Sequence, residues 1–252
     1  MIRLTKAIVS WLPKSWRGIA QYHINPLILD GFGVFNGQCF RQLIFIDLNK
    51  SCRFEAIVET GTYVGCTTQF LSRNTNIPVH SVESDAKNFQ VAKRHLKFYP
   101  SVHVVHANSV DFLNSLPLAQ ETRTFFYLDA HWEDSLPLAQ EVEIVLSRFK
   151  HFVIMIDDFA VQGDEGYTYD DYGPGKRLSL RDFPFHKDPR VRVFAPNRHS
   201  DQESGARRGC IILASPSLAP ALDSLDSLRR LELSEVDNHG ALSDFAEEVA
   251  GV

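Results

Sequence analysis

Short apolar runs alternate with longer amphipathic segments along the chain from about residue 54 onward. Between the runs, apolar side chains recur at helical spacing; Phe89, Ala92 and Leu96, for example, fall on one face of a predicted helix. Strands that alternate with helices of this length are typical of βαβ units and a mostly parallel sheet. The pattern therefore predicts an α/β fold with a doubly wound sheet. The first five predicted strands lie at 54–60, 78–83, 102–107, 124–129 and 152–158.

Two further apolar runs, at 190–195 and 209–214, raise the predicted sheet to seven strands. The core domain then spans 51–215. We expect an N-terminal helical segment before it, at 1–50, and a C-terminal helix and tail after it, at 216–252.

The core domain is interrupted by a segment at 160–188 that is rich in Gly, Asp and Tyr and poor in aliphatic residues. A segment of this length without regular structure is either a functional lid or a mobile surface loop. Its tyrosines and the Lys176-Arg177 pair could bind a polar ligand such as a sugar. The segment is predicted to be lid-like, with the mobile loop as the alternative.

A glycine-containing loop, "ETGTYVGCTT", follows the first predicted strand. Gly61 and Gly65 allow a tight turn and let a ligand approach the backbone. Glu59, at the end of the strand, could accept hydrogen bonds from a ligand ammonium group. The spacing of the glycines departs from the GxGxxG pattern of dinucleotide sites, which disfavours NAD.

Polar residues also follow the second and third predicted strands. Glu83 ends the second strand, where an acid in a doubly wound sheet reaches the ribose hydroxyls of a nucleoside. Asn108 and Ser109 follow the third strand and could line an adenine. Each residue alone could be an ordinary solvated group, but three polar strand ends in succession favour a nucleoside site.

Three acids follow the fourth and fifth strands: Asp129, and 28 residues later the pair Asp157-Asp158. Neighbouring parallel strands should bring these carboxylates to one edge of the sheet. Without a basic neighbour in sequence they would repel one another, and a divalent cation would remove that repulsion. Oxygen ligands favour Mg²⁺, Ca²⁺ or Mn²⁺. A strand-capping role is the alternative for Asp129 taken alone.

The segments "VETGTYVGCTT" and "SVES" resemble the cofactor signature of class I S-adenosylmethionine-dependent methyltransferases. The resemblance covers roughly residues 54–160 and implies a Rossmann-like methyltransferase domain. It further implies that Glu83 holds the ribose and that Ser109, with Asn108, lies near the adenine. The residues that it places around the methionine half of the cofactor are Glu59, Gly61, Thr62, Tyr63, Gly65 and Thr67.

The segments "YLDAHW" and "MIDDF" resemble the metal-site segments of catechol O-methyltransferase and of macrolide and aminocoumarin sugar O-methyltransferases. That resemblance implies Asp129, Asp157 and Asp158 as ligands of Mg²⁺, with Asp129 also beside the cofactor. The sugar enzymes carry a second acid where this chain has His131, and histidine can act as the base there. Catechol is disfavoured, because Glu133 and Asp134 follow where the catechol enzymes use a lysine.

Together these motifs predict an enzyme that transfers the methyl group of S-adenosylmethionine to a hydroxyl of a small molecule such as a sugar or natural product. His131 and Asp129 are the expected catalytic residues; Trp132 packs either on the adenosine or in the core. One alternative is a metal-independent methyltransferase whose acids bind substrate amines. The other is a non-catalytic cofactor-binding module that recognises a partner through 160–188.

Composition limits the partners and the location. The formal net charge of −5 argues against a nucleic-acid partner. No apolar run reaches the ~20 residues that a membrane span needs. Residues 1–20 are basic and are expected to pack on the domain as a helix, with an interfacial anchor as the alternative. The four cysteines are scattered without a metal-binding or disulfide spacing, which is typical of a protein of the reducing cytoplasm. The sequence is compatible with assembly into a homo-oligomer.

Overall fold

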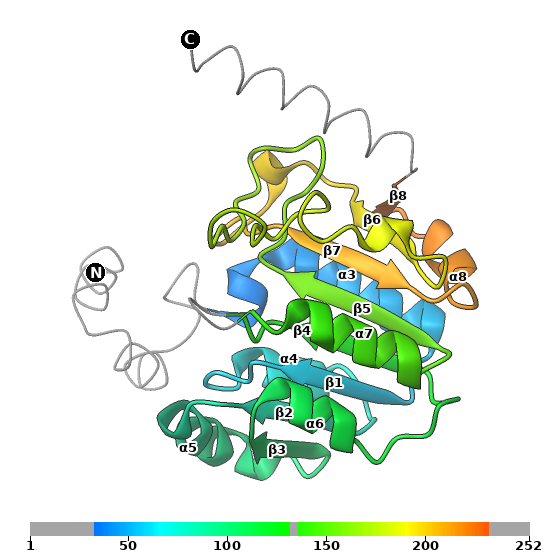
Figure 1. The fold of residues 1–252 in the computed structure, drawn as a ribbon. Helices are drawn as coiled ribbons and strands as arrows, with labels where there is room; N and C mark the ends of the chain where they lie inside the picture. Colours follow the sequence, from blue (N-terminus) through cyan, green and yellow to red (C-terminus); the bar gives the residue numbers. More distant parts are fainter. Residues whose placement is uncertain (1–32, 132–135, 232–252) are drawn as a thin grey trace, which may run out of the picture.

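The computed structural model describes residues 33–131 and 136–231, and its centre is one eight-stranded sheet with helices on both faces (Figure 1). The strand order is β3-β2-β1-β4-β5-β7-β6-β8. Strands β1 to β5 pair in parallel, whereas β7 runs antiparallel to both β5 and β6, and β8 antiparallel to β6. The predicted mostly parallel, doubly wound α/β fold is confirmed.

All seven predicted strands are present, and the predicted count is wrong by one. The missed strand, β8, has only three residues and two of them are arginines, so it shows no apolar alternation. The strands are β1 (Ala56–Thr60), β2 (Val79–Glu83), β3 (Val102–His106), β4 (Thr124–Leu128), β5 (Phe152–Asp157), β6 (Arg192–Pro196), β7 (Cys210–Ala214) and β8 (Leu228–Arg230).

Helices cover the two faces of the sheet in separate groups. On the face toward the viewer in Figure 1, α6 (Ser109–Ser115) packs beside α7 (Leu138–Arg148). On the opposite face, α3 (Cys39–Cys52) packs beside α8 (Ala219–Asp223). The remaining helical elements are η2 (Val34–Gly37), α4 (Cys66–Arg73), α5 (Ala86–His95), η3 (Leu96–Phe98), η4 (Phe185–Lys187) and η5 (Ser200–Gln202).

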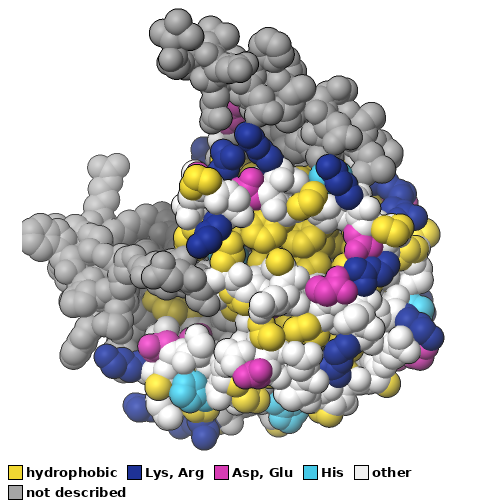
Figure 2. Space-filling view, viewed as in Figure 1, with side chains coloured by type: hydrophobic (Ala, Val, Ile, Leu, Met, Phe, Trp, Pro, Cys, Tyr) yellow, Lys and Arg dark blue, Asp and Glu magenta, His cyan; other side chains and the backbone are white. Residues whose placement is uncertain are grey.

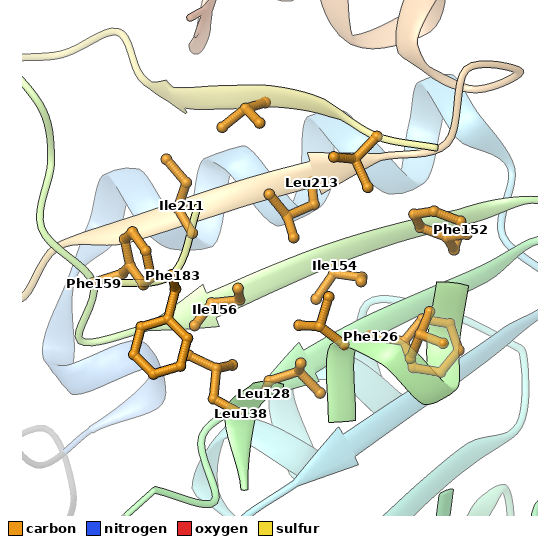
Figure 3. Close-up of a cluster of buried hydrophobic side chains, with 14 of the residues drawn as sticks. Phe126, Leu128, Leu138, Phe152, Ile154, Ile156, Phe159, Phe183, Ile211 and Leu213 are labelled. Carbon is orange, nitrogen blue, oxygen red and sulfur yellow. The ribbon is translucent and has the colours of Figure 1, made fainter. Parts of the chain in front are cut away.

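Alternating strand residues divide the core into two clusters, as the period of two in a strand requires. In β4, Phe126 and Leu128 face α6 and α7, whereas Phe125 and Tyr127 face α3. A central strand that is buried on both faces has a continuous run of apolar residues, and β4 and β5 therefore appear in the sequence as uninterrupted apolar runs. Figure 3 shows the first cluster, and Figure 2 shows apolar side chains at the centre of the same molecular face.

The segment at 160–188 has little regular structure, but part of it is in the core. Tyr167, Leu178, Leu180 and Phe183 are buried in the first cluster. Its role as a lid stays a prediction. In the described part of the chain no helix has the length and apolarity to cross a bilayer. Most of the predicted N-terminal segment (1–32) and most of the C-terminal tail (232–252) lie outside the described residues.

Candidate active site

The loop after β1 joins the ends of three strands. The N–H groups of Gly61 and Thr62 both donate to the Val82 carbonyl of β2, at 3.0 Å each. Gly61 has φ +83°, and a Cβ at this position would lie 2.2 Å from the carbonyl oxygen of Asp129. Asp129 N–H in turn donates to the Thr60 carbonyl at 3.0 Å. Only glycine fits here, and its close approach places the loop directly against the end of β4.

Glu59 is fully buried beside this loop rather than exposed at the strand end. Its Oε2 accepts hydrogen bonds from Ser81 Oγ at 2.6 Å and Thr68 Oγ1 at 2.5 Å. Among the described residues Oε1 has no hydrogen-bond partner. Burial raises the pKa of Glu59 to about 7, against the lowering effect of the two hydroxyls. Thr62 belongs to the same network, since its hydroxyl lies 2.6 Å from that of Ser81.

The other residues of the loop set its geometry. Gly65, with φ +86°, precedes α4, and a Cβ there would lie 2.8 Å from a Leu96 methyl carbon. Tyr63 also has a positive φ, +52°, and its N–H donates to Glu83 Oε2 at 2.6 Å. Thr67 Oγ1 accepts a hydrogen bond from Phe35 N–H at 3.2 Å, which ties η2 to α4.

Glu83 is buried at the end of β2, and two backbone amides orient its carboxylate. Besides Tyr63, Asp85 N–H donates to Oε1 at 2.8 Å. Burial raises the pKa of Glu83, and the amide donors counteract part of that rise. A carboxylate held this way is a fixed acceptor, which suits the recognition of ribose hydroxyls.

Asn108 and Ser109 begin α6, at the neighbouring strand end. Asn108 caps the helix by accepting a hydrogen bond from Asp111 N–H at 2.8 Å. Ser109 is buried beside Glu141 of α7. Burial raises the pKa of Glu141 to about 7, and hydrogen bonds from the hydroxyls of Ser109 and Thr60 counteract part of that rise. Glu141 is the third buried acid of this region after Glu59 and Glu83, and no motif in the sequence predicts it.

At the end of β4 and β5 the structure gathers Asp129, His131 and Asp158. One ligand atom from each lies within 4.8 Å of the others. His131 is 4% exposed, and neither ring nitrogen has a hydrogen-bond partner among the described residues. Burial lowers the pKa of His131, and burial together with the charge of Asp158 holds the pKa of Asp129 well above its usual range. Two oxygen donors and one unpartnered imidazole suit a divalent cation.

Asp157 lies at the same edge but is engaged elsewhere. It is fully buried and forms an ion pair with Arg41 of α3. Its Oδ2 accepts hydrogen bonds from Tyr127 Oη at 2.5 Å and from Asn36 Nδ2 at 3.0 Å. The Tyr127 hydroxyl also lies 3.4 Å from Asp129 Oδ2. All three predicted acids therefore meet at one edge, but Asp157 is not in the group that Asp129, His131 and Asp158 form.

Asp158 also has an arginine partner. Nε of Arg208 lies 2.6 Å from Asp158 Oδ1, and the same guanidinium pairs with Asp170 of the 160–188 segment. The three acids have no basic residue next to them in the sequence, but in the folded chain Arg41 pairs with Asp157 and Arg208 pairs with Asp158. Arg41, Arg208 and Asn36 are the site residues that sequence reasoning missed, because each lies far along the chain from its partner. Trp132 lies outside the described residues.

No family model matches the sequence, and a search of curated proteins finds no relative. Solved structures share the fold. An O-methyltransferase from Bacillus cereus, in complex with S-adenosylhomocysteine, aligns with a TM-score of 0.55 at 17% identity over 85% of this chain and 99% of that one. Cofactor-bound Rv0187 from MTB aligns with 0.55 at 18% identity, over 84% and 94%.

The O-methyltransferase TomG from Streptomyces achromogenes, involved in tomaymycin synthesis and bound to S-adenosylmethionine, aligns with a TM-score of 0.53 at 15% identity, over 84% and 95%. At such identities the similarity is one of fold. The predicted Rossmann-like methyltransferase fold is confirmed, and function has to be argued from the site itself.

Proposed function

We propose that the chain is an S-adenosylmethionine-dependent O-methyltransferase that uses a divalent cation, Mg²⁺ by the chemistry of its ligands, to methylate a hydroxyl of a small molecule such as a sugar or natural product. One observation carries the proposal. The backbone of Asp129 packs on Gly61 of the cofactor loop, while its side chain gathers with His131 and Asp158. A methyl donor on the loop and a hydroxyl on the cation would therefore meet at Asp129.

The cofactor would lie along the ends of β1, β2 and β3. Glu83 is the acceptor for the ribose hydroxyls, because its carboxylate is already oriented by the amides of Tyr63 and Asp85. Asn108 and Ser109 would border the adenine. The methionine end is assigned to the loop from Glu59 to Thr67, where Gly61 and Gly65 let the ligand approach the backbone.

The cation would be held by Asp129, His131 and Asp158, with Asp157 as a positioning residue behind them. Asp157 was predicted as a ligand, but it already accepts from Tyr127 and Asn36 and pairs with Arg41. Charge supports a cation at this edge. The edge holds two guanidinium groups and four carboxylates: Arg41 and Arg208, with Asp129, Asp157, Asp158 and Asp170. When all four acids are ionised, two negative charges are therefore uncompensated.

The chemistry requires an alcohol to be made nucleophilic. S-adenosylmethionine carries an activated methyl group, and a divalent cation lowers the pKa of a hydroxyl that it binds. The chain would orient the hydroxyl in line with the methyl group through Asp129 and Asp158. Burial lowers the pKa of His131, against the raising effect of Asp158 and Asp170, and so favours the neutral imidazole, which can either ligate the cation or accept the substrate proton.

Calorimetric titration with S-adenosylhomocysteine, with and without Mg²⁺, tests the cofactor site and the metal site together. We expect binding in both conditions and loss of methyl transfer after EDTA treatment. An absence of binding in either condition contradicts the cofactor assignment. Turnover that EDTA leaves unchanged contradicts the metal assignment alone.

The His131→Gln variant separates the two roles of the imidazole. If His131 is a ligand, Mn²⁺ affinity falls, by about 10-fold or more, together with turnover. If it is the base, turnover falls by about 10²- to 10⁴-fold while Mn²⁺ affinity is retained. Full turnover in His131→Gln removes both roles. His151→Gln is the matched control, because His151 precedes β5 at the opposite end of that strand, where it pairs with Glu121.

A metal-independent methyltransferase is the second candidate, and one observation favours it. Arg41 and Arg208 already pair with Asp157 and Asp158, so the acids do not depend on a metal for all of their compensation. In that enzyme Asp129 would bind a substrate amine. Methyl transfer to an amine, insensitive to EDTA, would identify this reading.

A further inference from the structure

The side chain of Arg208 joins two carboxylates that belong to different parts of the site. Its Nε lies 2.6 Å from Oδ1 of Asp158, at the end of β5. Its Nη2 pairs with Asp170, whose Oδ2 accepts a hydrogen bond from the Tyr172 hydroxyl at 2.5 Å. One guanidinium therefore connects a proposed cation ligand to the 160–188 segment.

The main chain of Arg208 is anchored on Arg41 of α3 and on Gln38, the residue that precedes this helix. Arg208 N–H donates to Gln38 Oε1 at 2.8 Å, and Gln38 Nε2 donates back to the Arg208 carbonyl at 2.9 Å. Arg41 donates to the same carbonyl. Gln38 and Arg41 are 1% and 2% exposed, so the guanidinium extends from a fixed base.

The backbone and the carboxylate of Asp158 are held by different groups. Its φ of +53° lies in the left-handed region, which aspartate adopts more often than most non-glycine residues, and its N–H donates to Asp157 Oδ1 at 2.8 Å. The Arg208 guanidinium engages Oδ1, which leaves Oδ2 for a further partner. Carboxylates that ligate metals are oriented by such hydrogen bonds on the oxygen away from the metal.

Backbone pairing brings residues 168–178, here called the strap, against the same edge. Asp170 N–H donates to the Asp158 carbonyl at 3.0 Å. Thr168 is paired on both sides: its N–H donates to the Arg207 carbonyl at 2.9 Å, and its carbonyl accepts from Gly209 N–H at 2.8 Å. The strap therefore lies between the end of β5 and the residues that lead into β7.

We propose that Arg208 is a positioning residue of the cation site: it fixes Asp158 in its ligating orientation and joins the strap to that ligand. The proposal rests on the proposed cation site. Asp170 balances the charge of the guanidinium on its far side, so Arg208 orients Asp158 without acting mainly as a competing cation. Part of the attachment of the strap to the end of β5 then depends on the Arg208–Asp170 pair, beside the backbone hydrogen bonds.

Titration of the full chain with Mn²⁺, followed by electron paramagnetic resonance, tests the positioning role. We expect Arg208→Gln to weaken Mn²⁺ binding by about 10- to 100-fold. Arg208→Lys, which keeps the charge and the backbone contacts but not the forked geometry, should also weaken it. Arg190→Gln is the matched control, because Arg190 likewise bridges two acids, Asp188 and Glu143, at an exposed position, and neither acid belongs to the proposed site. Its Mn²⁺ affinity should equal that of the wild type.

Hydrogen exchange provides the second readout. Amides of the strap should exchange faster in Arg208→Gln than in the wild type, while those of β2 stay unchanged. Equal or tighter Mn²⁺ binding in both Arg208 variants overturns the proposal, since it would mean that Arg208 only competes for Asp158. A wild-type chain that binds no Mn²⁺ overturns the cation site and this inference together. Wild-type binding with unaffected variants overturns this inference alone.

Discussion

The two halves of the candidate site stabilise their buried carboxylates in different ways. On the cofactor side, Glu59 and Glu83 accept hydrogen bonds from hydroxyls of β2 and α4 and from backbone amides of the loops after β1 and β2. On the acid side, Asp157 and Asp158 pair with guanidinium groups that arrive from α3 and from the residues before β7. Neutral donors orient a carboxylate without cancelling its charge, whereas an arginine does both.

This difference has a chemical consequence. The cofactor side keeps acceptors in fixed positions, which suits recognition of ribose hydroxyls and an ammonium group. The acid side holds more charge in a smaller volume and needs cations, whether from the chain or from a bound metal. The contact of Gly61 with Asp129 is where the two halves meet.

Of the substitutions considered, removal of Arg41 should cause the largest loss in the free energy of unfolding, through the acid side of the site. Arg41→Met leaves the fully buried Asp157 without its counter-charge, and we expect a loss of about 3–5 kcal/mol in the free energy of unfolding. Urea denaturation measures it. Adding Asp157→Asn should recover part of the loss. The control Arg123→Met removes an exposed pair with Glu55 and should change stability by less than about 1 kcal/mol.

Gly61→Ala should damage the junction between the halves. The substitution combines a strained φ of +83° with a Cβ placed 2.2 Å from the Asp129 carbonyl, so we expect a loss of about 2–4 kcal/mol and weaker binding of S-adenosylhomocysteine. Gly173→Ala separates the two causes, since Gly173 has φ +102° but nothing within 4 Å of its Cβ. Equal losses in both variants would mean that the close contact contributes nothing.

A pH series sharpens the description of the cofactor side. Burial raises the pKa of Glu59 from 4.5 to about 7, so the stability that its protonated form contributes is complete below about pH 4.5 and is lost as the pH rises through about 7. Glu59→Gln should remove that part of the decline, worth up to about 3 kcal/mol. Glu141 retains its own part, because burial raises its pKa to about 7 as well. The exposed Glu55 provides the control in Glu55→Gln, and an unchanged slope in Glu59→Gln contradicts the assignment.

The sequence predicted features that depend on neighbours along the chain. Seven strands were identified from apolar runs, and the ends of those strands brought Glu59, Glu83 and Asp129 to one edge, as the rule for parallel sheets requires. The strand β8 was missed because three residues carry no periodicity.

The missed parts of the site depend on pairs distant in the chain. Arg41 lies on a helix whose sequence gives no sign of a buried guanidinium, and Asn36 belongs to "GFGVFNG", which reads only as a loop. Phe35 and Asn36 have positive φ values of 48° and 58°, and this turn places Asn36 on Asp157. No local pattern predicts which distant partner will meet a given acid.

The anchoring of Arg208 on Gln38 and Arg41 bears on how the protein is made. During synthesis Arg41 leaves the ribosome long before Asp157, and Arg208 follows later still. The nascent chain can form the β1–β3 end of the sheet early, since those contacts are close in sequence. The acid side closes only when the two ends of the described chain come together. The proposed cation site is therefore the part of the molecule that is completed last, since a chain that ends before residue 208 lacks the guanidinium that pairs with Asp158.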